Sequence, residues 1–116
     1  MQKCASEGFA IDGFYRDDKT SRESLAFHEE DNCRWQLVDK DGSCVDGQFK
    51  RTDDPNILIL KKENGEEFGT VHVAYISRRR NQGQIYLIRN TEVTRFYLVS
   101  TDPAFTVESG DVDADV

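Results

Sequence analysis

The chain has 116 residues, of which 37% are hydrophobic and 32% charged, and its formal net charge is −7. This length predicts one domain that can bury a modest core without a metal or disulfides. The acidic balance argues against nonspecific nucleic-acid binding, which depends on neutralising phosphates, and no apolar stretch is long enough to span a bilayer.

Eight extended runs follow one another along the chain, and none has the 3.6-residue apolar period of an amphipathic helix. They are expected at residues 8–15, 23–29, 33–38, 44–50, 56–62, 67–76, 84–89 and 93–99. Between runs lie Asp41-Gly42, Asn64-Gly65, Asn81-Gln82-Gly83 and Asn90-Thr91. Because Gly and Asn accept the positive φ of tight hairpins, the sequence predicts an all-β fold: a single antiparallel up-and-down barrel or meander of about eight short strands, with little helix.

The hairpin over residues 33–50 can be placed in register. Lys40-Asp41-Gly42 suits a three-residue loop with Gly42 in the left-handed region. The pairing then places Leu37 opposite Val45, Trp35 opposite Gly47 and Cys33 opposite Phe49. The indole of Trp35 is expected to pack over the bare backbone of Gly47. Cys44 points to the other face from Cys33, so a disulfide between them is not expected.

The end of the chain differs in composition. Residues 106–116 have no apolar period and contain Glu108, Asp111, Asp113 and Asp115. Low hydrophobicity with high charge is typical of disorder. We therefore expect a β-barrel domain over residues 1–105 and a disordered acidic tail over residues 106–116.

The chain has three cysteines, and no secretory signal follows Met1. Reduced thiols in the cytoplasm are the simplest interpretation. The alternative, if the sequence has been trimmed, is a lipid anchor on Cys4.

Three short segments carry a resemblance. They are Gly13-Phe14-Tyr15, Gly47-Gln48-Phe49 and Thr94-Arg95-Phe96-Tyr97. Together they are similar to small calycin barrels, the lipocalin-like and fatty-acid-binding proteins. The resemblance implies that Arg95 and Tyr97 face inward and hold a ligand carboxylate, and we expect Tyr15 and Trp35 to be further ligand contacts.

The densest basic cluster is Arg78-Arg79-Arg80, in the turn expected after the sixth run. Arginine donors suit carboxylates and phosphates, so the cluster is a candidate site for an acidic partner. The alternative is a solvated loop that keeps the hairpin end soluble.

Catalytic and metal motifs are missing from the sequence. Adjacent carboxylates such as Asp17-Asp18 and Asp53-Asp54 make poor catalytic pairs, because neighbouring positions on a strand point apart. Asp39–Ser43 lacks the later ligands of a calcium loop, and there is no Cys-x-x-Cys spacing for zinc. We expect no enzyme activity, no cofactor and no metal.

Two functions remain open, and a third is less favoured. The first is a non-catalytic lipocalin-like barrel for an apolar or carboxylated ligand. The alternative is a protein–protein interaction module with a filled core, which binds through the two-sided strand Ile57–Leu60 or the basic loop 78–80. A nucleic-acid-binding barrel of the OB type needs a helix between its third and fourth strands, and residues 50–56 are too few.

Overall fold

The computed structural model describes residues 10–17 and 22–102, which form one closed antiparallel barrel. Its strands are β1 (Gly13–Asp17), β2 (Ser24–His28), β3 (Arg34–Val38), β4 (Cys44–Arg51), β5 (Ile57–Lys62), β6 (Glu67–Ser77), β7 (Gln82–Arg89) and β8 (Glu92–Ser100). Each strand pairs with the next, and β8 pairs with β1. The predicted all-β up-and-down barrel is confirmed, and the described residues contain no helix. The expected acidic tail lies outside the described residues.

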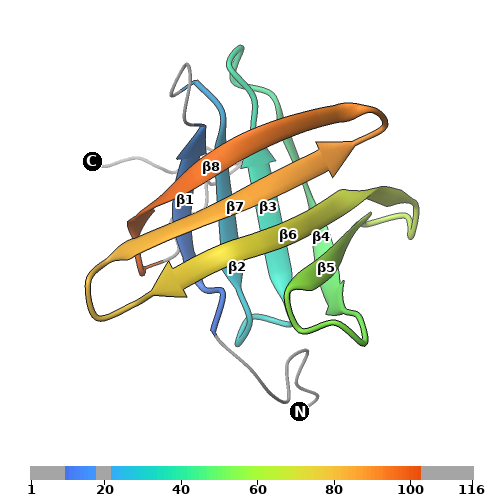
Figure 1. Cartoon of the computed structure of the whole chain (residues 1–116). Helices are drawn as coiled ribbons and strands as arrows, with labels where there is room; N and C mark the ends of the chain where they lie inside the picture. The colour runs from blue at the N-terminus through green and yellow to red at the C-terminus, as the bar shows by residue number, and fades with distance from the viewer. Residues whose placement is uncertain (1–9, 18–21, 103–116) are drawn as a thin grey trace.

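The strands form two walls that cross. Figure 1 shows β6, β7 and β8 running at a steep angle over β1 to β4, which lie behind them. Closure of the sheet pairs both sides of every strand. The barrel therefore offers a partner its outer faces and its two ends, and no free strand edge.

The core fills the inside of the barrel. Successive side chains on a strand point to opposite faces, and one set from each strand gathers in a single apolar cluster. Its buried members are Ile11, Tyr15, Leu25, Phe27, Trp35, Leu37, Phe49, Leu58, Leu60, Val71, Val73, Ile85, Leu87, Phe96 and Leu98. On β5, Leu58 and Leu60 belong to this cluster, whereas Ile57 and Ile59 are half-buried on the outer face.

The β3–β4 hairpin has the predicted register. Trp35 pairs with Gly47 and Leu37 with Val45, and Gly42 has a φ of 92°. The indole Nε1 of Trp35 donates to the carbonyl oxygens of Gln48, at 3.1 Å, and Lys61, at 2.9 Å. A Cβ on Gly47 would overlap the Lys61 carbonyl oxygen. The missing side chain at position 47 is therefore what lets the indole reach the backbone of β5.

The other turns follow their expected chemistry, with one difference. Gly65 and Asn90 have positive φ angles of 92° and 53°. In the segment 81–83 the residue with positive φ is Asn81, at 56°, rather than Gly83. Asn is one of the few residues besides Gly that adopt the left-handed region, and the Asn81 side-chain amide donates to the Val99 carbonyl oxygen on β8 at 3.0 Å. Strand β7 begins directly afterwards at Gln82.

Candidate functional site

The interior of the barrel is occupied by aromatic side chains. Tyr15 and Phe27 have ring centroids 5.8 Å apart, and Phe27 and Phe49 have centroids 5.6 Å apart, both pairs edge to face. Trp35 lies 5.0 Å from the Phe68 ring. Tyr15 and Trp35 are 0% exposed, so these two expected ligand contacts are members of the packed core. Their role toward a ligand remains a prediction.

The last strand is oriented differently from the expectation drawn from the calycin resemblance. Phe96 and Leu98 face the core, and Phe96 pairs with Ile85. Arg95 is exposed and Tyr97 is 38% exposed, on the outer side of β8. The expectation that Arg95 and Tyr97 face inward is therefore wrong. Both faces of this strand are apolar enough to be buried, and the outward orientation leaves the guanidinium hydrated rather than desolvated in the core.

The outward side chains of β6, β7 and β8, together with Arg16 of β1, form a continuous surface that we call the Tyr–Arg face. The strand register arranges it in three rows. The first row is Arg16, Tyr97, Gln84 and Tyr75; the second is Arg95, Tyr86 and His72; the third is Val93, Ile88 and Thr70. Neighbouring members of a row lie on adjacent strands, roughly 4.8 Å apart. Residues from β1 and β6 therefore belong to one surface patch that a binding partner can contact as a whole.

Two contacts connect the first and second rows. The Arg95 guanidinium carbon lies 5.5 Å from the centre of the Tyr97 ring. The Gln84 amide nitrogen donates to the Tyr86 hydroxyl at 2.7 Å. These contacts restrict the side chains, and a restricted surface loses less conformational entropy when a partner binds.

The Tyr–Arg face and the adjoining end of β8 also carry exposed apolar area. Among the described residues, the exposed large hydrophobic side chains are Tyr75 at 48%, Val93 at 60%, Tyr97 at 38% and Val99 at 45%. All four lie on β6 or β8. Tyr97 and Val99 are neighbours on the outer face of β8, whereas Gln84 lies between Tyr97 and Tyr75 and Arg95 lies between Tyr97 and Val93. Exposed aromatic side chains interspersed with arginine are typical of interaction sites.

The three arginines of the β6–β7 turn have different environments. Arg78 donates to the carbonyl oxygens of Asp12, at 2.6 Å, and Thr101, at 3.3 Å. Arg79 and Arg80 are exposed and make no hydrogen bond or ion pair with the described residues. Of the three expected partner-binding residues, two are therefore directly available, while Arg78 holds the two ends of the described chain together.

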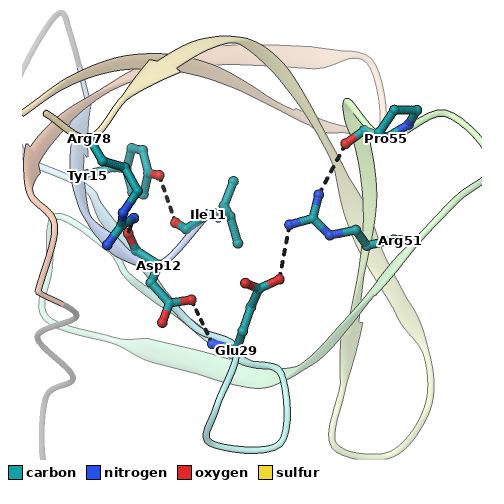
Figure 2. Close-up of polar contacts among 7 residues, drawn as sticks. All are labelled: Ile11, Asp12, Tyr15, Glu29, Arg51, Pro55 and Arg78. Carbon is teal, nitrogen blue, oxygen red and sulfur yellow. Dashed lines mark hydrogen bonds and ion pairs between the residues drawn. The ribbon is translucent and has the colours of Figure 1, made fainter. Parts of the chain in front are cut away.

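The barrel end next to this turn is closed by the residues before β1 (Figure 2). The Ile11 side chain is fully buried, and the Tyr15 hydroxyl donates to the Ile11 carbonyl at 2.8 Å. The Asp12 carboxylate accepts the Glu29 backbone N–H at 2.8 Å. Burial raises the pKa of the Tyr15 phenol far above its usual range, so the phenol stays protonated at neutral pH and serves as a hydrogen-bond donor.

Arg51 completes this closure (Figure 2). Its guanidinium forms an ion pair with Glu29 at 3.0 Å and donates to the Pro55 carbonyl at 3.2 Å. The Arg51 side chain is 8% exposed. A buried charge of this kind needs its partner, so the Arg51–Glu29 pair is structural.

An open cleft of about 680 Å³ lies at the opposite end of the barrel. At its base the Arg89 guanidinium donates to the Glu23 carboxylate at 3.2 Å and to the Thr94 hydroxyl at 3.0 Å. Lys40 and Arg95 also line it, together with the carboxylates of Asp17, Asp39 and Glu92. The cleft is polar and of a size that suits a small charged molecule.

Of the two predictions about the cysteines, one is confirmed and one is wrong. Cys33 is disulfide-bonded, whereas Cys44 is a free, exposed thiol. The prediction that these two do not pair is confirmed. The expectation that every thiol is reduced is wrong for Cys33, because the strand register excluded only one of its possible partners. The remaining cysteine, Cys4, lies outside the described residues.

Within residues 10–17 and 22–102, no three His, Cys, Asp or Glu side chains are grouped so that they could hold a metal ion. The same residues contain no helix that is long and apolar enough to cross a membrane.

Comparison with known proteins matches this chain to no family model, no curated protein and no solved structure. In general shape the closed eight-stranded antiparallel barrel is consistent with a calycin-like barrel. Fold and surface together define a class: a small closed β-barrel with a packed interior and an exposed patch rich in tyrosine and arginine.

Sequence reasoning did not single out Arg16, Tyr75, Val93 or Val99. Each is unremarkable within its own strand, and only the barrel register makes Arg16 and Tyr75 members of one row. Composition holds one clue, since residues 68–91 contain no Asp or Glu in an otherwise acidic chain.

Proposed function

We propose that this protein is a non-catalytic protein-binding module that uses the Tyr–Arg face. The observation that carries the proposal is the gathering of the exposed large hydrophobic side chains of the described residues on β6 and β8. Tyrosine and arginine are enriched among the residues that dominate binding energy at protein interfaces. A protein of this kind has a packed interior and binds its partner through exposed side chains on the outer surface.

The packed interior supports a surface site over an internal one. The aromatic side chains of Tyr15, Phe27 and Trp35 fill the space that a ligand would occupy in a hollow barrel. The strand Ile57–Leu60 is a weaker candidate, because β5 is paired on both sides, with β4 and β6. A partner cannot extend the sheet there by adding a strand.

Affinity capture with matched variants tests the proposal. The tagged protein is incubated with an extract of the cells that produce it, beside Tyr75→Ser/Tyr97→Ser and the control Gln48→Ser/Lys50→Ser. The control positions are exposed on the outer side of β4. We expect a protein captured by the wild type and the control to be lost with the tyrosine variant, at unchanged melting temperature. Capture that survives the tyrosine variant would contradict the proposal.

A small carboxylated ligand is a second candidate, because Arg95 and Lys40 line the cleft of about 680 Å³. Asp17, Asp39 and Glu92 line it as well and oppose an anion there, which makes this candidate the weaker one. A ligand that binds only the folded state raises the melting temperature by mass action. A small carboxylate such as citrate is expected to raise it under this candidate, and Arg95→Met to abolish the rise. A melting temperature that citrate leaves unchanged would reject the candidate and leave the Tyr–Arg face as the site.

A further inference from the structure

Charge is strongly segregated along this chain. The whole protein carries a formal charge of −7, yet residues 68–101 contain five arginines and a single acidic residue, Glu92. This segment comprises nearly all of β6 and the whole of β7 and β8. The wall of the barrel that bears the Tyr–Arg face is therefore basic, whereas the remainder of the chain is strongly acidic.

The positive groups surround the exposed rings. Arg16 and Tyr97 are cross-strand partners in the first row, and Arg95 is stacked on Tyr97. Arg79 and Arg80 follow Tyr75 on the same hairpin and are exposed. A guanidinium at a surface can donate two parallel hydrogen bonds to one carboxylate. Several carboxylates spaced along a partner would each find a donor on this face.

The apolar members of the face decide which kind of polyanion fits it. Single-stranded nucleic acid gains its affinity by stacking bases on aromatic rings. Val93 of the face and Val99 beside it, at 60% and 45% exposure, present aliphatic side chains that do not stack on bases. Aliphatic and aromatic anchors beside arginines match a polypeptide in which apolar and acidic side chains are mixed.

The size of the face indicates how much of a partner it contacts. The first row crosses four strands and so spans about 14 Å, and the first and third rows are also about 14 Å apart. A stable interface between two folded domains buries about 800 Å² on each partner, which is more than a patch of these dimensions supplies. A segment of about ten residues is the better match.

We propose that the Tyr–Arg face binds a short acidic segment of another protein, with the partner's carboxylates on Arg16, Arg95, Arg79 and Arg80 and its apolar side chains against Tyr75, Tyr97 and Val93. This inference rests on the proposed function, because it names the partner chemistry of the same surface.

Fluorescence anisotropy with labelled probes tests this chemistry on the full chain. The probes are a peptide of about ten residues in which glutamate alternates with leucine and serine, its counterpart with lysine in place of glutamate, and an oligodeoxythymidine of similar length. We expect the glutamate peptide to bind and the lysine peptide not to. Binding should weaken strongly between about 0.1 M and 1 M salt, as the Debye length falls from about 10 Å to 3 Å. Tighter binding of the oligodeoxythymidine, or equal binding of the lysine peptide, would overturn the inference.

Charge-matched variants separate this face from general electrostatics. Arg16→Ala/Arg95→Ala removes two positive charges from it, and Lys50→Ala/Lys62→Ala removes two from the other wall of the barrel. We expect the arginine variant to bind the glutamate peptide at least about tenfold more weakly, because it loses charge-assisted hydrogen bonds, and the lysine variant to bind within about twofold of the wild type. Equal weakening by both variants would overturn the inference. If the cellular partner is lost with the tyrosine variant but remains bound at 1 M salt, the protein-binding function stands and the acidic partner is rejected.

Discussion

At the scale of single residues, Gly47 is the glycine with the least room for a side chain. Its Cβ would overlap the Lys61 carbonyl oxygen and lie 2.8 Å from the Lys62 Cα, both backbone atoms of β5. We expect Gly47→Val to destabilise the protein by about 3 kcal/mol, since backbone must shift to admit the side chain. Chemical denaturation measures this, with the exposed neighbour Gln48→Ala as the control. A midpoint equal to that of the control would show that β5 yields without cost.

Tyr15 links stability to alkaline pH. Burial raises its pKa in the folded state above the value of about 10 that it has in the unfolded chain. The stabilisation from keeping the phenol neutral is complete below pH 10 and is lost as pH rises from there toward the folded-state pKa. Melting temperatures from pH 8 to pH 11 test this. We expect the wild type to lose more stability over this range than Tyr15→Phe, which has no proton to release.

The same substitution has an effect at neutral pH. Tyr15→Phe leaves the buried Ile11 carbonyl oxygen without the hydroxyl that donates to it at 2.8 Å. We expect a loss of about 1–2 kcal/mol at pH 7, the usual cost of an unsatisfied buried acceptor. Two melting curves that superimpose at pH 7 would mean that another donor replaces the hydroxyl.

The sequence predicted the packing of Trp35 over Gly47 because a turn with Gly42 fixes the register of its hairpin, and register determines which side chains share a face. It did not predict the orientation of Arg95. Val93, Tyr97, Phe96 and Leu98 make both faces of that strand apolar, so alternation alone does not identify the inner one. The pairing with β7 across the closed barrel decides it.

At the scale of elements, the β6–β7 hairpin has two roles that can be separated. Arg78 anchors the hairpin to Asp12 and Thr101, whereas Arg79 and Arg80 make no hydrogen bond or ion pair with the described residues. We expect Arg78→Ala to cost about 1 kcal/mol, because it loses two hydrogen bonds that join distant parts of the chain but are exposed to water. Arg79→Ala/Arg80→Ala should change stability by less than about 0.5 kcal/mol.

Chemical denaturation of the two variants measures the difference in stability. Anisotropy with the glutamate peptide measures the difference in binding. The double variant should weaken peptide binding while Arg78→Ala, once folded, should retain it. Equal destabilisation by both variants would contradict the assignment of a structural role to Arg78 and a binding role to Arg79 and Arg80.

The elements were more predictable than the surface they build. Turn residues such as Gly42, Gly65 and Asn90 determine the backbone conformation of only a few neighbouring positions, so the ends of the strands can be predicted from the local sequence. The Tyr–Arg face depends on residues far apart in the chain, since Arg16 and Tyr97 become neighbours only when the last strand meets the first. The amino-acid sequence alone does not show that these two residues are neighbours in space.

At the scale of the whole molecule, one strand pair differs from all the others. Seven of the eight pairs join consecutive strands, whereas β1 and β8 close a loop that includes every strand between them. Bringing distant segments together carries the larger loss of chain entropy. This seam is therefore expected to open more readily than the hairpins. Hydrogen exchange should show its amides exchanging faster than those between β6 and β7.

The Tyr–Arg face spans this seam, because Arg16 lies on one side of it and Tyr97 on the other. A partner lying along the first row would contact both sides at once and would stabilise only the closed barrel. Exchange at the β1–β8 amides should then slow as the glutamate peptide is added, while exchange between β3 and β4 stays the same. Binding and barrel closure would be one linked equilibrium, in which the partner acts as a non-covalent clasp.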